Sequence, residues 1–181
     1  MKPFSKIRPL LLAAMFAALT AVCSQIQIPL PMVPINLALF AVFLAGALLG
    51  AKYGGLSMAV YVLLGAVGVP VFAGLTGGAG ILFGQTGGYI FGYIVASVVV
   101  GLLIKAWGRS YLKLCIAMAL GGLTCYAFGT VWFMAVTHMG LWTSLAYCVF
   151  PFLLGDVVKI ALAALLALRL WGPLEKNGWA R

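Results

Sequence analysis

Long apolar runs separated by short polar breaks dominate the pattern of residues along this chain. A helix needs roughly 20 residues, at about 1.5 Å per residue, to cross a hydrocarbon core about 30 Å thick. Six stretches approach that length, and we expect each to form a membrane-crossing helix: residues 9–24, 35–50, 55–69, 87–104, 114–136 and 151–168. The second and third are short. The sequence therefore predicts an all-α membrane protein with six transmembrane helices.

Composition excludes an ordinary water-soluble domain, because 65% of the 181 residues are hydrophobic and only 7% are charged. We expect one integral membrane domain over residues 1–181, embedded in lipid and without a linker. The net charge of +9 could suggest nucleic acid. However, the basic residues lie singly between apolar runs and form no patch with interleaved aromatic residues, so nucleic acid is not an expected partner.

The positions of Lys and Arg predict how the helices are oriented. Ten of the 11 basic residues lie before the first stretch, after the last, or in the second and fourth connections between stretches. Cytoplasmic loops retain Lys and Arg, so both termini are predicted to be cytoplasmic. Lys159 is the exception.

Two connections on the opposite side have unusual compositions. Residues 25–34, QIQIPLPMVP, contain three prolines, which favour an extended segment over a regular helix. Residues 70–88 contain seven glycines and no charge, and we expect them to fold back over the helix bundle. The alternative is a pair of tight turns. The chain has no Gly-Lys pair for a phosphate-binding P-loop, so energy for transport would come from an ion gradient or another subunit.

Two charged residues interrupt the last apolar stretch. If the helix begins at Pro151, Asp156 and Lys159 lie roughly 8 and 12 Å below its outer end and share one helix face. A charge at the centre of a membrane costs about 2.5 to 3.5 kcal/mol, so a function is expected for these residues. The alternatives are a self-neutralising pair or a Lys159 side chain that extends to water.

The remaining residues do not supply catalytic or metal chemistry near these charges. The chain has one histidine, His138, which is predicted in an outer loop, and four cysteines without metal-ligand spacing. We therefore expect no catalytic residue, no metal ligand and no cofactor, and no enzyme activity. Asp156 can accept from N–H groups and Lys159 can donate to a carbonyl or carboxylate, which favours binding of a small uncharged or monoanionic polar compound.

Alanines recur at four-residue spacing in the first stretch: Ala13, Ala17 and Ala21, with Ala14 and Ala18 beside them. Small residues let another helix backbone approach closely. Packing within the bundle and a surface for a separate protein are both consistent with this spacing.

Three segments together resemble the BioY family, the biotin-binding S components of energy-coupling factor (ECF) vitamin transporters. They are FPFLLGDVVK at 150–159, GVPVFAGLTGGAGILFGQTGGY at 68–89 and IPLPMVPINL at 28–37. The resemblance runs from the first predicted helix to the last. It implies a six-helix S-component fold in the cytoplasmic membrane of a prokaryote, with a high-affinity biotin pocket near the outer face, capped by outer loops.

The resemblance also implies a set of binding residues. Asp156 and Lys159 would contact the polar end-groups of biotin, and Asp156 would accept from its ureido N–H groups. Near the lid, Phe72 would form an apolar wall, and the cavity would be lined or closed by Thr86, Gly87, Gly88 and Tyr89.

The chain departs from the usual family pattern at three positions. Family members often have Thr where Asn36 stands, Gln where Ala38 stands and Pro where Gln85 stands. Asn36 can still donate and accept hydrogen bonds, so we keep it among the expected binding residues.

The alanine strip resembles the S-component motif that docks on the membrane-coupling T subunit, which works with two ATPase subunits. Biotin uptake as an S component is therefore the leading hypothesis. A carrier for another vitamin-like solute and a membrane assembly protein are the alternatives.

Overall fold

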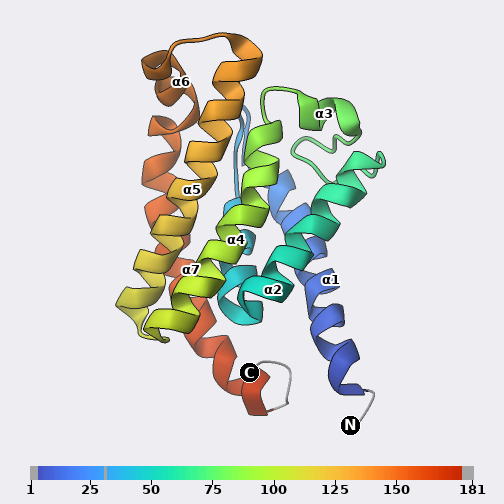
Figure 1. Ribbon diagram of the computed structural model, residues 1–181, viewed down its shortest axis with the longest axis vertical. Coiled ribbons are helices and arrows are strands. Elements are labelled where there is room, and N and C mark those ends of the chain that lie inside the picture. The colour runs from blue at the N-terminus through green and yellow to red at the C-terminus, as the bar shows by residue number, and fades with distance from the viewer. Residues whose placement is uncertain (1–3, 31, 177–181) are drawn as a thin grey trace.

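The structure, a computed structural model, describes residues 4–30 and 32–176, and these are predominantly helical (Figure 1). Within these residues the long helices are α1 (Phe4–Gln25), α2 (Ala38–Ala66), α4 (Gly87–Trp107), α5 (Tyr111–Thr137) and α7 (Phe150–Lys176). The short elements are strands β1 (Gln27–Ile28) and β2 (Ile35–Asn36) and helices α3 (Ala79–Phe83) and α6 (Leu141–Cys148). Lys2 and Arg181, which contribute to the predicted orientation, lie outside the described residues.

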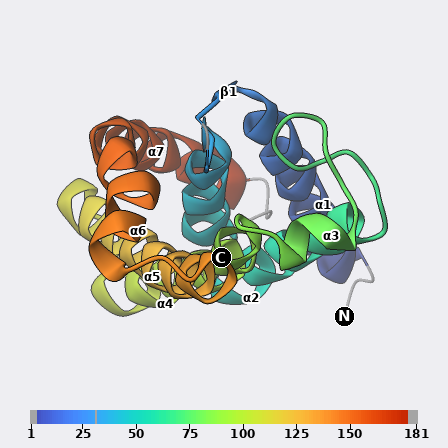
Figure 2. The ribbon, with the colours of Figure 1, turned by 90° about the horizontal axis from the view of Figure 1, so that it is seen from above.

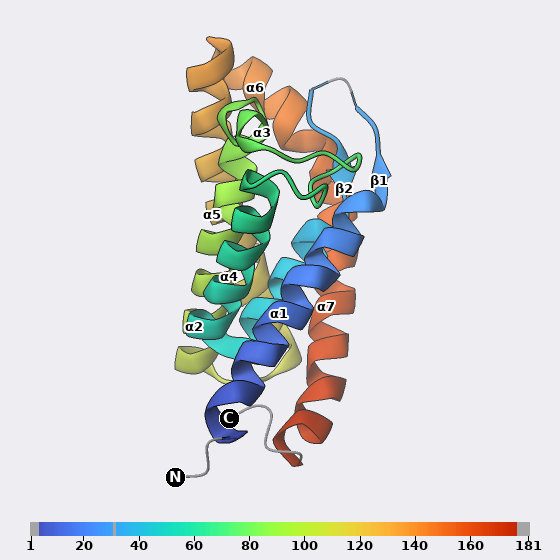
Figure 3. The same ribbon diagram turned by 90° about the vertical axis from the view of Figure 1, so that its right-hand side faces the viewer.

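Five helices in the described part of the chain are long and apolar enough to cross a membrane. The predicted stretches 9–24, 87–104, 114–136 and 151–168 each fall within one of them. The other two predicted stretches both fall on α2, so the structure gives five candidate spans where the sequence predicted six. The start of α1 and the end of α7 lie at the same end of the bundle (Figures 1 and 3).

A break at Gly50 divides α2 into two arms, residues 38–49 and 51–66. Gly50 has φ 71° and ψ 178°, a backbone conformation that glycine adopts readily because it has no Cβ atom. The chain descends along the first arm and returns upward along the second (Figures 1 and 3). The predicted second stretch begins too early, because Ile35 and Asn36 pair with β1 in a short antiparallel hairpin.

The core of the bundle is built around α2, which packs against α1, α4 and α7. The Phe43 side chain in its first arm is fully buried. Close packing against α4 depends on glycine: a Cβ atom on Gly101 would lie 2.2 Å from the backbone nitrogen of Ala51, and one on Gly46 would lie 2.5 Å from the carbonyl oxygen of Ser97. These contacts show how small residues let two membrane helices meet.

The upper end of the bundle carries the β1–β2 hairpin, α3, α6 and the segment between α2 and α4; Figure 2 looks down on it. In that segment Phe72 pairs with Thr76 in a small bridge, and the Phe72 side chain is only 1% exposed. The Gly-rich segment therefore folds back over the bundle, as the sequence predicted. His138 ends α5 in a left-handed conformation, with φ 57°, and is exposed.

An ion pair ties the lower ends of two helices together. Arg109, in the connection between α4 and α5, pairs with Glu175 near the end of α7. The same guanidinium lies 4.8 Å from the centre of the Trp171 ring, so a cation–π contact accompanies the ion pair. The connection before α5 is thus joined to the last turns of α7.

Candidate functional site

A cavity of about 190 Å³ lies among the β1–β2 hairpin, α2, the segment 72–86, α4, α5 and α7. Aromatic side chains make up much of its wall: Tyr61, Phe72, Tyr89, Tyr93, Tyr126 and Phe152. Polar groups reach it from Asn36, Thr76, Thr86, Asp156 and Lys159. A largely apolar wall with a few placed polar groups is typical of small-molecule sites.

Asp156 and Lys159 lie together at one side of this cavity. Since α7 begins at Phe150, Asp156 is six residues and Lys159 nine residues along the helix, roughly 9 and 14 Å from its start. The Lys159 Nζ atom lies 2.8 Å from Asp156 Oδ1, and Asp156 is only 5% exposed. The i, i+3 spacing therefore brings the two charges into direct contact as well as onto one face.

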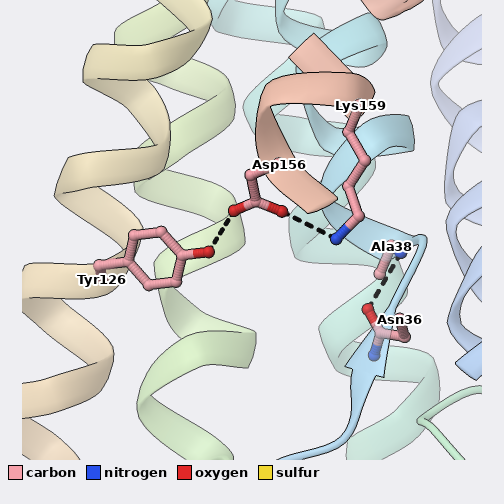
Figure 4. Close-up of polar contacts among 5 residues, drawn as sticks. All are labelled: Asn36, Ala38, Tyr126, Asp156 and Lys159. Carbon is pink, nitrogen blue, oxygen red and sulfur yellow. Dashed lines mark hydrogen bonds and ion pairs between the residues drawn. The ribbon is translucent and has the colours of Figure 1, made fainter. Parts of the chain in front are cut away.

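Tyr126 of α5 donates a hydrogen bond to the second oxygen of Asp156. Figure 4 shows the carboxylate held between the Tyr126 hydroxyl and the Lys159 ammonium. Sequence reasoning missed Tyr126, because a single tyrosine in an apolar stretch carries no signal until the packing of α5 on α7 is known. Asp156 therefore has one neutral and one charged donor.

Asn36 serves the fold and also borders the cavity. Its Oδ1 atom accepts the N–H of Ala38 at 3.1 Å, which satisfies one of the free N–H groups at the start of α2 (Figure 4). The same side chain carries an amide NH₂, a donor that a ligand can use.

Phe72 and Tyr89 line the cavity, and each contacts neighbouring side chains. The rings of Phe72 and Tyr61 meet edge to face with centroids 5.6 Å apart. The space for Phe72 depends on Gly65, since a Cβ atom there would lie 2.0 Å from the Phe72 ring. The Tyr89 hydroxyl shares a 3.2 Å hydrogen bond with the hydroxyl of Thr130.

Thr86 also lines the cavity, whereas Gly87 and Gly88 do not belong to its wall among the described residues. Both glycines are buried at the start of α4. A Cβ atom on Gly87 would lie 1.7 Å from the Leu82 carbonyl oxygen, and one on Gly88 would lie 2.2 Å from the Cβ atom of Trp132. Their absent side chains make room for α3 and α5.

The alanine strip divides between two faces of α1. Ala13 and Ala17 are 2% exposed and pack inside the bundle, while Ala14 and Ala18 are exposed and Ala21 is half-buried. The alternative of internal packing therefore applies to Ala13 and Ala17 in this structure.

The polar groups of the cavity can form hydrogen bonds with a small polar molecule. A carboxylate can accept from N–H groups, and an ammonium and an amide can donate to carbonyl or carboxylate oxygens. Within residues 4–30 and 32–176, no three His, Cys, Asp or Glu side chains gather in one place. The cavity presents hydrogen-bonding and charged groups next to aromatic side chains.

The chain is similar in sequence to known proteins over most of its length. The sequence profile of the BioY family matches residues 1–176. The biotin transporter BioY of Thermotoga maritima is 42% identical over 165 residues, which cover 91% of this chain and 96% of that protein. The probable biotin transporter BioY of Pyrococcus horikoshii is 39% identical, over 92% of this chain and 98% of that protein.

The fold also has a solved counterpart. The crystal structure of the S-component for biotin from an ECF-type ABC transporter superposes with a TM-score of 0.87 at 28% sequence identity, and the match covers 94% of each chain. Family profile, relatives and fold agree over nearly the whole length of the chain. The chain therefore belongs to the BioY family.

Proposed function

We propose that this protein binds biotin with high affinity and takes it up across the cytoplasmic membrane of a prokaryote, as the S component of an ECF-type transporter. The observation that carries the proposal is the Asp156–Lys159 pair, buried in an aromatic cavity and hydrogen-bonded by Tyr126. The relatives that match this chain are named biotin transporters, which supports transport over catalysis.

Biotin has the groups that this cavity can recognise. Its ureido ring has two N–H groups that would donate hydrogen bonds to Asp156. Its carboxylate or ureido carbonyl would accept a hydrogen bond from Lys159. Its fused rings and alkyl chain would lie against Phe72 and Tyr89. New bonds to Asp156 and Lys159 would offset the loss of part of their contact with each other.

The membrane topology of this proposal has six crossings with both termini in the cytoplasm. The two arms of α2, residues 38–49 and 51–66, would be separate crossings of about 18 and 24 Å. Both are shorter than the hydrocarbon core, which a protein can accommodate by local thinning of the bilayer. The cavity would then lie near the outer face, within one domain that spans residues 1–181.

The partners of this proposal are a T subunit and two ATPase subunits. The structural counterpart is an S-component from an ECF-type ABC transporter, which supports that assembly here. The T subunit would dock on the face of α1 that points away from the bundle. Ala14 and Ala18 are exposed on this face and are small enough for another helix to approach closely. The ligand is transported, and no cofactor takes part.

Equilibrium binding of labelled biotin to the purified protein in detergent tests the proposal. We expect saturable one-to-one binding that unlabelled biotin displaces. Other vitamins in the same competition should leave the label bound. Absence of saturable biotin binding, or stronger competition by another vitamin, would contradict the proposal.

A further inference from the structure

The segment that places Phe72 over the cavity is fastened to the end of α1 by the side chains of Gln25 and Ser24. The Nε2 atom of Gln25 donates to the Phe72 carbonyl at 3.0 Å, and Gln25 Oε1 accepts the N–H of Leu75 at 2.8 Å. Its neighbour Ser24 lies with its hydroxyl oxygen 2.7 Å from the Val71 carbonyl. The loop between α2 and α3 reaches across to the upper end of α1 (Figures 2 and 3).

The loop needs such support because its backbone is strained. Leu75 has φ 54°, in the left-handed region that side chains other than glycine rarely occupy. Its own side chain is 70% exposed, so side-chain packing does not hold it there. Residues in such conformations persist when their surroundings fix them, and the Gln25 oxygen bonded to the Leu75 N–H is one such constraint.

Gln25 therefore holds the loop at two points. It bonds the carbonyl of Phe72 and the N–H of Leu75. A shorter or apolar side chain cannot make both bonds from α1. Because Phe72 lines the cavity, the bonds that hold its backbone also hold its ring at the cavity wall.

We propose that Gln25 is a positioning residue that latches the Phe72 loop shut and couples the opening of the cavity to the end of α1. This inference rests on the proposed function, since the loop matters as a gate only if a ligand enters the cavity. The Gln25 bonds go to backbone groups of the loop and to no side chain of the cavity wall, so they favour the latched loop equally with and without a ligand. Loss of the latch should therefore make the gate open more often without greatly changing affinity.

Binding kinetics of labelled biotin to the Gln25→Ala variant test the latch. We expect association and dissociation rate constants both to rise about tenfold, as expected for the loss of about 1.4 kcal/mol in hydrogen bonds, while Kd changes about twofold or less. Gln25→Glu should behave alike, because a carboxylate keeps the acceptor for Leu75 but has no donor for Phe72. The matched control is Gln85→Ala. Gln85 is an exposed glutamine between α3 and α4, and its replacement should leave both rate constants at the wild-type values.

Unchanged rates in Gln25→Ala would overturn the latch. So would faster dissociation with an equal loss of affinity, since that result makes Gln25 a contributor to the bound state and not to the gate.

Alkylation of the native cysteines gives a second readout that needs no biotin. Cys125 lines the cavity beneath the loop, whereas Cys148 is buried outside the cavity wall. In ligand-free Gln25→Ala we expect a small thiol reagent to modify Cys125 several-fold faster, with Cys148 unchanged, as located by peptide mass spectrometry. Equal acceleration at both cysteines would indicate general loosening and overturn the latch. If the wild type fails to bind biotin, the proposed function fails while the Cys125 result still decides the latch.

Discussion

Asp156→Asn separates the two roles that the buried acid can have, in ligand binding and in fold stability. The amide keeps the size and shape of the carboxylate but removes its charge. The Tyr126 hydroxyl still has an acceptor, whereas Lys159 loses the counter-charge 2.8 Å away. The substitution therefore changes both the affinity for biotin and the free energy of unfolding, by different amounts.

For binding, a hydrogen bond to a charged group contributes about 1.5 to 3 kcal/mol and a neutral one about 0.5 to 1.5 kcal/mol. Loss of the charge should therefore weaken biotin binding by about 1 to 2 kcal/mol, or about 5- to 30-fold in Kd. For stability, removal of one partner of a buried pair costs about 3 to 5 kcal/mol. We expect about 2 to 3 kcal/mol here, because the Lys159 side chain is 11% exposed at the cavity and can reach water.

The assay is a titration with labelled biotin together with denaturant unfolding of the ligand-free protein, for the wild type, Asp156→Asn and the double variant Asp156→Asn with Lys159→Met. The double variant has no unpaired ammonium, so its stability should return toward that of the wild type while its affinity stays weak. Wild-type affinity in Asp156→Asn, with only the stability loss, would refute the reasoning. The pair would then be structural.

Two further substitutions test the walls of the cavity. Gly65→Ala should displace the Phe72 ring, because the new Cβ atom would lie 2.0 Å from it. Biotin binding in a titration should weaken by about tenfold. The higher helix propensity of alanine should offset part of any stability loss. Tyr126→Phe removes the hydroxyl that donates to Asp156, and in denaturant unfolding the ligand-free protein should lose about 1.5 to 3 kcal/mol of stability.

Matched controls accompany these two predictions. Gly80→Ala places a Cβ atom in open space and should bind biotin as the wild type does, so equal losses at Gly80 and Gly65 would contradict the steric argument. Tyr89→Phe removes a neutral hydrogen bond to Thr130 and should cost only about 0.5 to 1.5 kcal/mol. A cost as large as that of Tyr126→Phe would show that the charge of Asp156 is not the cause.

The long helices could be predicted from the sequence because hydropathy reports directly which segments suit a membrane. Hydropathy did not predict α3 and α6, because these helices are five and eight residues long and are too short to cross a membrane. The break at Gly50 was anticipated only as a gap between two stretches. Hydropathy carries no information about backbone dihedral angles, so it could not predict the φ of 71° at Gly50.

The candidate site could be predicted in part for a similar reason. Asp156 and Lys159 were identifiable because charge inside an apolar run is costly, whatever the fold. Tyr126 was not, since its role depends on how α5 packs on α7. Ala13 and Ala14 looked alike in sequence, because lipid and a membrane-protein interior are both apolar, and only the structure separates the buried residue from the exposed one.

Helix α7 is joined near both of its ends to the same neighbour. Asp156 bonds Tyr126 within α5, and Glu175, 19 residues or about 28 Å farther along α7, pairs with Arg109 just before α5. Sliding or turning α7 against α5 would break one of these contacts. The two contacts therefore oppose displacement of α7 along its axis and keep the Asp156 side of the cavity in register with α5.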